Sequence, residues 1–394
     1  MANSLTNVRQ TLQKMRESQF GPFIPVLVAL VAIWLYFGIT EPVFLSPRNF
    51  YFLFMQSAVV GTLAVGVTVV LLLGDIDLSV AAVSGVCAAA MAVLITNMGI
   101  SAPLACLIAV FIGTALGFIQ GLIIAYIGVP SFVVTLAGLL GFQGLMLKVL
   151  GIHGAVNMNH PFVRGLTTIT LPASLGWGIA IAGIVLLALA VWRTRTVRTR
   201  LGLDVDPMIA LVGRVAFFAI LTFGAVFTLN AYRGVPLLVI LLLGLTALLG
   251  WVTTSTPFGR SLFAVGGNAE SARRVGISIQ KVRIAAFAIV GLMAAIGGIV
   301  GASRYASVSF NAFAGGPLLL EAIGAAVIGG TSLFGGRGSV WNAILGALVI
   351  GSLGNGLDLS GASAADKLMF SGGILLLAVS LDAVTSGEAA KRKK

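Results

Sequence analysis

Side chains that perform chemistry are sparse in this chain, and one pair of carboxylates stands out. Asp75 and Asp77 lie in the segment Gly74-Asp-Ile-Asp-Leu-Ser-Val80, between two long apolar runs. A charged side chain that faces lipid costs roughly 2.5–3.5 kcal/mol, so both carboxylates need polar surroundings. One interpretation is that Asp77 or Ser79 caps the following helix, with both carboxylates near interfacial water. The other is that this segment is an unwound point facing a polar path.

The remaining reactive side chains form no convincing site. His153 and His160 share a polar loop without acidic neighbours, which favours solvated histidines over metal ligands. Cys87 and Cys106 fall in apolar stretches, which favours buried thiols over a disulfide. We find neither a Gly-x-x-x-x-Gly-Lys-Ser/Thr phosphate loop nor a nucleophile–base pair, and Glu321 is the chief acidic residue within an apolar run. The sequence therefore predicts a protein that is not an enzyme and that has no metal, no cofactor and no ATP site of its own.

The composition predicts an all-α polytopic membrane protein with about 10–12 transmembrane helices, one or two of them broken by glycine. Of its 394 residues 58% are hydrophobic and 9% are charged, too few charges to cover a soluble domain of this size. Long apolar runs recur from end to end. We expect spans near 22–39 (an uncleaved first span), 52–73, 78–98, 103–127, 131–150, 176–192, 209–229, 236–252, 281–302, 318–330, 339–356 and 365–384.

The net charge of +12 indicates orientation rather than nucleic-acid binding. With the N-terminus in the cytoplasm and alternating spans, eighteen lysines and arginines lie on the cytoplasmic side and six outside. We therefore expect a cytoplasmic tail at 1–21, a single transmembrane domain at 22–386 and a basic cytoplasmic tail at 387–394.

The longest charged interruption is the loop 253–279, which we expect to contain a short cytoplasmic helix. Gly266 and Gly267 should break the preceding segment, and Asn268 should cap the new helix. Glu270 would lie in its first turn and two arginines in its last, as the helix dipole favours, with Gly276 ending it. Such a helix offers a binding surface to a protein outside the membrane. The candidate docking residues are Gly267, Asn268, Glu270, Ala272, Arg273, Arg274 and Gly276.

A second irregular segment runs from Gly329 to Gly338. Five glycines in ten residues cannot form a lipid-facing helix, so this backbone must lie within protein or near water. The pattern faintly repeats the one around Gly74: each apolar run passes through a glycine break to a Ser-Val pair, at Ser79 and at Ser339. Broken apolar segments at matching places in two halves are typical of a translocation path.

These motifs resemble those of permease subunits of bacterial ABC importers. Glu270-Ser-Ala-Arg-Arg-Val-Gly276 is similar to their coupling motif, Glu-Ala-Ala followed by three residues and Gly, with Ser in place of the middle Ala. Further segments resemble the ribose/xylose branch over roughly residues 45–385, and the additional pair of spans at 176–229 resembles the longer, xylose-type members. The segments are Ile76-Asp-Leu-Ser79, Val129-Pro-Ser-Phe132 with Thr135-Leu136, Phe258-Gly-Arg260, Ala264-Val-Gly-Gly-Asn268, Gly329-Gly-Thr-Ser-Leu333 and Asn355-Gly-Leu357. One departure is Leu-Leu-Glu321, where this branch often has Glu-Leu-Asp.

The resemblance implies a permease in the bacterial inner membrane for a monosaccharide such as D-xylose. Two copies would form the path, a separate ATP-binding subunit would bind the loop 253–279, and a periplasmic protein would deliver the sugar. Candidate path or gate residues are Asp75, Asp77, Ser79, Ser131, Thr135, Glu321, Gly330, Thr331, Ser332 and Asn355. A secondary sugar transporter is the alternative, although intramembrane charges are scarce, and a scaffold subunit is a third. The residues do not specify the sugar, since selectivity in this design lies largely with the binding protein.

Overall fold

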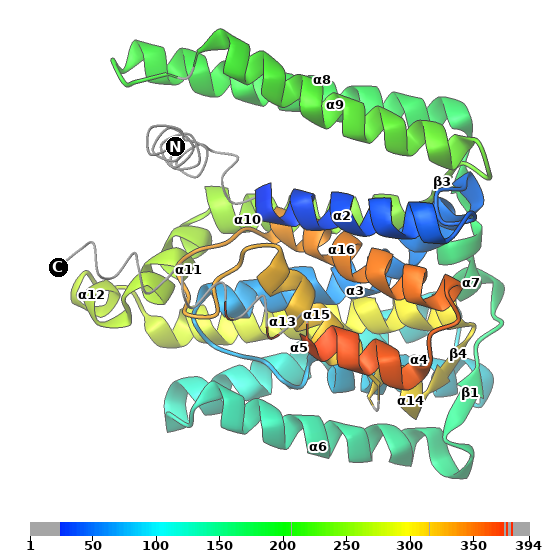
Figure 1. Cartoon of the computed structure of the whole chain (residues 1–394). Helices are drawn as coiled ribbons and strands as arrows, with labels where there is room; N and C mark the ends of the chain where they lie inside the picture. The colour runs from blue at the N-terminus through cyan, green and yellow to red at the C-terminus, as the bar shows by residue number, and fades with distance from the viewer. Residues whose placement is uncertain (1–23, 206, 315, 374–375, 377–379, 381–394) are drawn as a thin grey trace.

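The computed structural model describes residues 24–205, 207–314, 316–373, 376 and 380, and this part of the chain is almost entirely helical (Figure 1). The predicted tails at 1–21 and 387–394 lie outside the described residues, as does part of the predicted last span at 365–384.

Helix α3 (Pro47–Leu72) is the centre of the molecule. Ser46 caps it, because its hydroxyl oxygen accepts a hydrogen bond from the N–H of Asn49 at 3.2 Å. Pro47 occupies the first turn, where its missing N–H needs no partner. Within its most apolar stretch 94% of the residues are buried, as expected for a helix that is apolar on every side. It packs against α13 (Ile279–Tyr305), α15 (Leu318–Ile328) and α16 (Val340–Leu359).

Small residues bring the next helices close to this centre. Helix α5 (Ala102–Leu122), which continues as a π-helix at Ile123–Ile127, packs along α13. A Cβ at Gly113 or Gly117 would collide with the backbone of α13, at Gly291 or at Phe287. This spacing of small residues permits backbone approach between membrane helices. Helix α4 (Val80–Thr96) contacts α5 and α13, and α6 (Ser131–Leu150) packs on α4.

Short strands tie together the loops at one end of the helices. Strand β1 (Ala155–Asn157) pairs antiparallel with β4 (Ser307–Ser309), and β2 (Thr170–Leu171) pairs with β3 (Val235–Pro236). A 3₁₀ turn at Gly151–His153, α7 (Pro161–Thr168) and α14 (Phe310–Phe313) complete this end. The strand pairs therefore bring together three segments of the chain: the one that carries β1 and β2, the one that carries β3 and the one that carries β4. The predicted alternation of spans places all three on the same side of the membrane. Which side this is stays a prediction.

The outer helices surround this bundle unevenly. Helix α2 (Ile24–Thr40) packs on α16, and α10 (Leu237–Ser255) on α3. Helices α8 (Ala173–Arg200) and α9 (Met208–Asn230) form a hairpin that stands apart from the bundle (Figure 1). At the opposite end from the strands, α11 (Pro257–Gly267) and α12 (Ala269–Arg274) follow α10.

The described residues contain nine helical segments long and apolar enough to cross a membrane, besides the shorter apolar helices α2 and α4. One of the nine, Phe310–Ile328, reaches this length only because it counts α14 together with α15. The predicted fold class is confirmed. The predicted span at 318–330 is short: α15 has 11 residues and reaches about 17 Å, roughly half the hydrocarbon thickness. Gly329 and Gly330 end it, as the glycine content of this segment predicts.

Candidate functional site

Hydrogen bonds from capping side chains fix where α11 and α12 begin. The hydroxyl of Thr256 accepts the N–H of Gly259 at 3.3 Å at the start of α11. The side chain of Asn268 accepts the N–H of Ser271 at 2.8 Å, which confirms the predicted cap of α12. Gly276 has φ 84°, a left-handed conformation that glycine adopts without strain, and it follows the end of α12 as predicted.

The predicted break before α12 comes at the second of the two glycines, since α11 includes Gly266 and ends at Gly267. One expectation about docking is wrong. Ala272 is 3% exposed and faces the bundle, so it cannot contact a partner directly. Six residues make fewer than two helical turns, and one side of so short a helix has to pack on α13.

The outer face of α12 is charged, with one apolar residue beside it. Glu270 lies 3.6 Å from a guanidinium nitrogen of Arg273 and 3.3 Å from Nε of Arg274, and all three side chains are at least 60% exposed. Val275, which follows directly, is 76% exposed. Sequence reasoning missed Val275, because nothing in the local pattern distinguishes it from the buried apolar residues nearby.

Gly266 belongs instead to a glycine junction that joins α11 to two loops. A Cβ on Gly266 would overlap the carbonyl oxygen of Leu72 and lie 2.8 Å from the backbone nitrogen of Gly336. The N–H of Gly336 donates to that same carbonyl oxygen of Leu72 at 2.9 Å. A Cβ on Gly335 would lie 2.8 Å from the nitrogen of Gly74 and 2.8 Å from the carbonyl oxygen of Gly266. Both glycine-broken loops therefore meet α11 by backbone contact, which the faint sequence repeat could not indicate.

Asp75 and Asp77 have different partners. Asp75, 6% exposed, accepts a 2.9 Å hydrogen bond from Nε of Arg283 on α13 and a second at 3.4 Å. Burial raises the pKa of the Asp75 carboxyl, while Arg283 and the hydroxyl of Ser131 lower it in part. The carboxylate of Asp77 accepts both the N–H and the hydroxyl of Ser79 at 2.7 Å. This geometry matches the predicted cap by Asp77, whereas Ser79 makes no side-chain cap. The expectation that both carboxylates lie near interfacial water is wrong, since Asp75 and Asp77 are 6% and 3% exposed.

The predicted polar residues of α6 reach the same loop. The hydroxyl of Ser131 accepts the N–H of Ile76 at 3.3 Å, and Thr135 donates to the Ile76 carbonyl at 3.2 Å. Ser131 does not cap α6, although it follows Pro130, since it is the first residue of that helix and its hydroxyl binds another segment. Gln120 of α5 adds a 3.0 Å contact to Ser79, a partner that sequence reasoning missed.

The loop after α15 lies beside these residues, at Gly74. Thr331 and Ser332 are 1% and 2% exposed, and Gly330 is exposed with φ 90°. The backbone of Thr331 bonds to Ala326, but its hydroxyl has no partner among the described residues.

Glu321 and Asn355 lie apart from this group. They occupy the first turn of α15 and the last part of α16, and because these antiparallel helices pack together, both lie at the end that carries the strands. Asn355 accepts a 2.7 Å hydrogen bond from Asn49 and donates to Gln56 at 3.3 Å, so it joins α16 to α3. Eight of the ten predicted path residues thus gather at one end and two at the other.

The chain resembles known transport proteins over most of its length. The family described as branched-chain amino acid transport system / permease component matches residues 49–210 and 206–379. The chain is 41% identical over 363 residues to the xylose transport system permease protein XylH of Escherichia coli (strain K12), covering 91% of each chain. It is 35% identical to XylH of Haemophilus influenzae over 91% of this chain and 95% of that one.

A more distant relative is the autoinducer 2 import system permease protein LsrC of Salmonella typhi, 30% identical over 82% of this chain and 74% of that protein. No solved structure matches the chain significantly. The chain therefore belongs to the family of branched-chain amino acid transport system / permease components.

Proposed function

We propose that this chain is the membrane-spanning permease subunit of an ATP-driven importer for a monosaccharide, D-xylose or a related pentose or hexose. Similarity to xylose permeases over nine-tenths of the chain supports this proposal. A secondary transporter that couples to protons uses chains of acidic residues within the membrane. Such residues are scarce in this chain, which favours the ATP-driven class.

The proposal includes the partners that such a subunit needs. Two copies of the chain would form the path in a bacterial inner membrane, with both termini in the cytoplasm. A separate ATPase would supply the energy, since the chain has no phosphate loop. A periplasmic binding protein would deliver the sugar to the end formed by the short strands.

The observation that carries the coupling role is the exposed face of α12. Glu270, Arg273 and Arg274 offer charges of both signs, and Val275 offers an apolar anchor that a cleft on an ATPase would bury. Local caps and buried Ala272 hold this face in place.

The glycine junction supplies a route from this surface to the candidate gate. When α12 moves with the ATPase, α11 moves with it, because only Asn268 separates the two helices. Gly266 presses on Leu72 and Gly336 without an intervening side chain, so the displacement reaches both loops directly. Packed backbone contacts of this kind transmit a shift instead of absorbing it.

The docking surface is tested by co-purification with the ATPase and by sugar uptake in proteoliposomes. Val275→Asp should abolish ATPase binding and uptake, because a carboxylate at an apolar anchor is left desolvated and unpaired. Ile152→Asp is the control for ATPase binding: Ile152 is 97% exposed at the opposite end, so this variant should retain the ATPase. Normal uptake by Val275→Asp with a bound ATPase would disprove this docking surface.

The coupling route has a matched pair of variants in adjacent residues. Gly266→Ala places a methyl group against Leu72, whereas Gly267→Ala points into open space. We expect Gly266→Ala to retain the ATPase but to lose at least about tenfold in uptake, since overpacking costs about 1–3 kcal/mol. Gly267→Ala should behave like the wild type. Equal uptake by the two variants would rule out the junction as the route while leaving the docking surface intact.

A further inference from the structure

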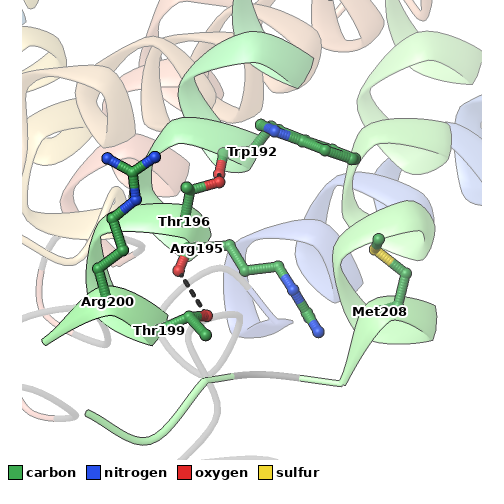
Figure 2. Close-up of a pocket in the computed structure, with 6 residues that line it drawn as sticks. All are labelled: Trp192, Arg195, Thr196, Thr199, Arg200 and Met208. Atoms are coloured by element: carbon green, nitrogen blue, oxygen red, sulfur yellow. Dashed lines mark hydrogen bonds between the residues drawn. The ribbon is translucent and has the colours of Figure 1, made fainter. Parts of the chain in front are cut away.

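A cavity of about 270 Å³ lies between helices α8 and α9, but it does not suit a hydrophilic ligand (Figure 2). Its lining is almost wholly apolar. The hydroxyls of Thr196 and Thr199 donate to carbonyl oxygens of their own helix, at 3.0 and 2.9 Å. In Figure 2 the Arg200 guanidinium points away from Met208 on the facing helix. Polar groups that are free to hold such a ligand lie elsewhere, at the end of the bundle that carries the strands.

Three polar side chains at that end make no hydrogen bond or ion pair within the described residues. They are Arg304 and Tyr305, in the last turn of α13, and Glu321, in the first turn of α15. Arg304 and Glu321 are half-buried, and the Nε atom of Arg304 is fully enclosed. Burial of a charged group without a partner costs free energy, so such groups often mark a place where water or a ligand binds.

The three side chains form one cluster with balanced charge. Arg304 and Glu321 are both close enough to the Tyr305 hydroxyl for their charges to act on it. The charge of Asp358, on α16, acts in turn on Glu321. Asp358 is itself paired with Lys367. One guanidinium therefore offsets one carboxylate, and the second carboxylate is offset by its lysine, so the cluster as a whole favours a neutral ligand over an ion.

The Tyr305 ring adds an aromatic surface to the cluster. It is 42% exposed and packs edge-on against Phe313 of α14, with ring centroids 5.9 Å apart and planes at 83°. Phe313 is completely buried. Gly301, one turn earlier in α13, leaves room for this contact, since a Cβ there would lie 2.7 Å from the Phe313 ring. The Tyr305 ring is therefore held in place while much of its surface stays open.

We propose that Arg304, Tyr305 and Glu321 form a binding site for a neutral monosaccharide, an inference that rests on the function proposed above. A carboxylate only accepts hydrogen bonds and a guanidinium only donates them, whereas a sugar hydroxyl does both. Neighbouring hydroxyls of one sugar donate to Glu321 and accept from Arg304, and the C–H groups of its ring lie against Tyr305. A few polar groups beside an aromatic wall are typical of a small-molecule site. An ion would pair with one of the two charges and leave the other without a partner.

The test measures sugar binding to the full-length chain in lipid nanodiscs, without the ATPase, by saturation-transfer NMR. The probes are D-xylose, D-ribose and D-glucose. We expect at least one of them to bind, and Glu321→Gln and Arg304→Gln each to weaken its binding at least about tenfold, because each removes a hydrogen bond to a charged group. Absence of binding of all three sugars, or wild-type binding by both variants, would overturn the proposal.

The chain offers a matched control at the same end of the bundle. Tyr232 and Arg233 are also neighbours in the sequence, but the guanidinium carbon of Arg233 lies 5.3 Å from the centroid of the Tyr232 ring and so has a partner. Arg233→Gln should therefore bind sugar like the wild type. Equal weakening by Arg233→Gln and Arg304→Gln would indicate a general effect of charge and overturn the site.

Two further measurements separate this site from folding and from the proposed function. Tyr305→Leu keeps both charges and removes the exposed ring, so it should fold and yet bind sugar more weakly; unchanged binding would overturn the role of Tyr305 in the site. Sugar uptake by the complete importer in proteoliposomes tests the proposed function by itself, because its absence in the wild type would contradict that function. Wild-type uptake together with unchanged sugar binding in Glu321→Gln and Arg304→Gln would overturn this site alone.

Discussion

The ion pair between Asp75 and Arg283 should be the most sensitive polar contact of the α3–α4 connection. Arg283→Gln leaves the Asp75 carboxylate, 9% exposed as a side chain, with much weaker support. Asp75→Asn leaves an arginine whose side chain is 33% exposed and can reach water. Loss of a hydrogen bond to a buried charged group costs about 1.5–3 kcal/mol. We therefore expect Arg283→Gln to destabilise by about 3 kcal/mol, and Asp75→Asn by about half as much.

The double variant should destabilise by clearly less than the sum of the single variants. Once Arg283 is absent, Asp75→Asn no longer breaks an ion pair. It removes an unpaired buried charge instead. A coupling energy of about 1–2 kcal/mol is expected for such a pair. The measurement is the free energy of unfolding of the purified protein in mixed micelles, for the wild type and all three variants.

The chain contains an internal control for this cycle. Glu270 and Arg274 form an ion pair with side chains 60% and 77% exposed, and its cycle should yield no more than about 0.5 kcal/mol. Additive effects of Asp75→Asn and Arg283→Gln, within about 0.5 kcal/mol, would refute the reasoning that the two groups act as a pair.

Three further predictions concern other parts of the chain. Asp77→Asn should keep near-normal uptake and stability because an amide caps as well as a carboxylate. Asp77→Ala, which removes the cap, should lose about 1 kcal/mol of stability. A large loss of uptake in Asp77→Asn would instead show that the charge is needed. Asn355→Leu leaves the Asn49 amide short of a partner and should cost about 1–3 kcal/mol in the same unfolding measurement; an unchanged stability would contradict this role of the α3–α16 contact. In intact cells a membrane-impermeant thiol reagent should label a cysteine at Ile152 but not at Arg198, and the reverse pattern would invert the predicted orientation.

Local signals in the sequence were sufficient for the membrane architecture and for the ends of several helices. Apolar run length predicts spans because the bilayer thickness sets it, and the Gly-rich segment after Ile328 predicts the short α15. Asn268 and Gly276 each affect only the nearest turn of α12. Neighbouring residues in the sequence are therefore sufficient to predict that the first begins this helix and the second ends it.

What the tertiary structure decided involves partners far away in the chain. Asp75 pairs with a residue 208 positions away, and Ser131 binds Ile76 instead of capping α6. Gly266 lies within α11 instead of breaking it. Its missing Cβ allows another backbone segment to approach closely, and the sequence does not show which segment approaches. The sequence by itself determined which segments are long and apolar enough to cross a membrane, and where the short helix begins and ends. Which face of that helix is exposed, and which loops it touches, depends on packing between helices, whose apolar surfaces carry little local information about their partners.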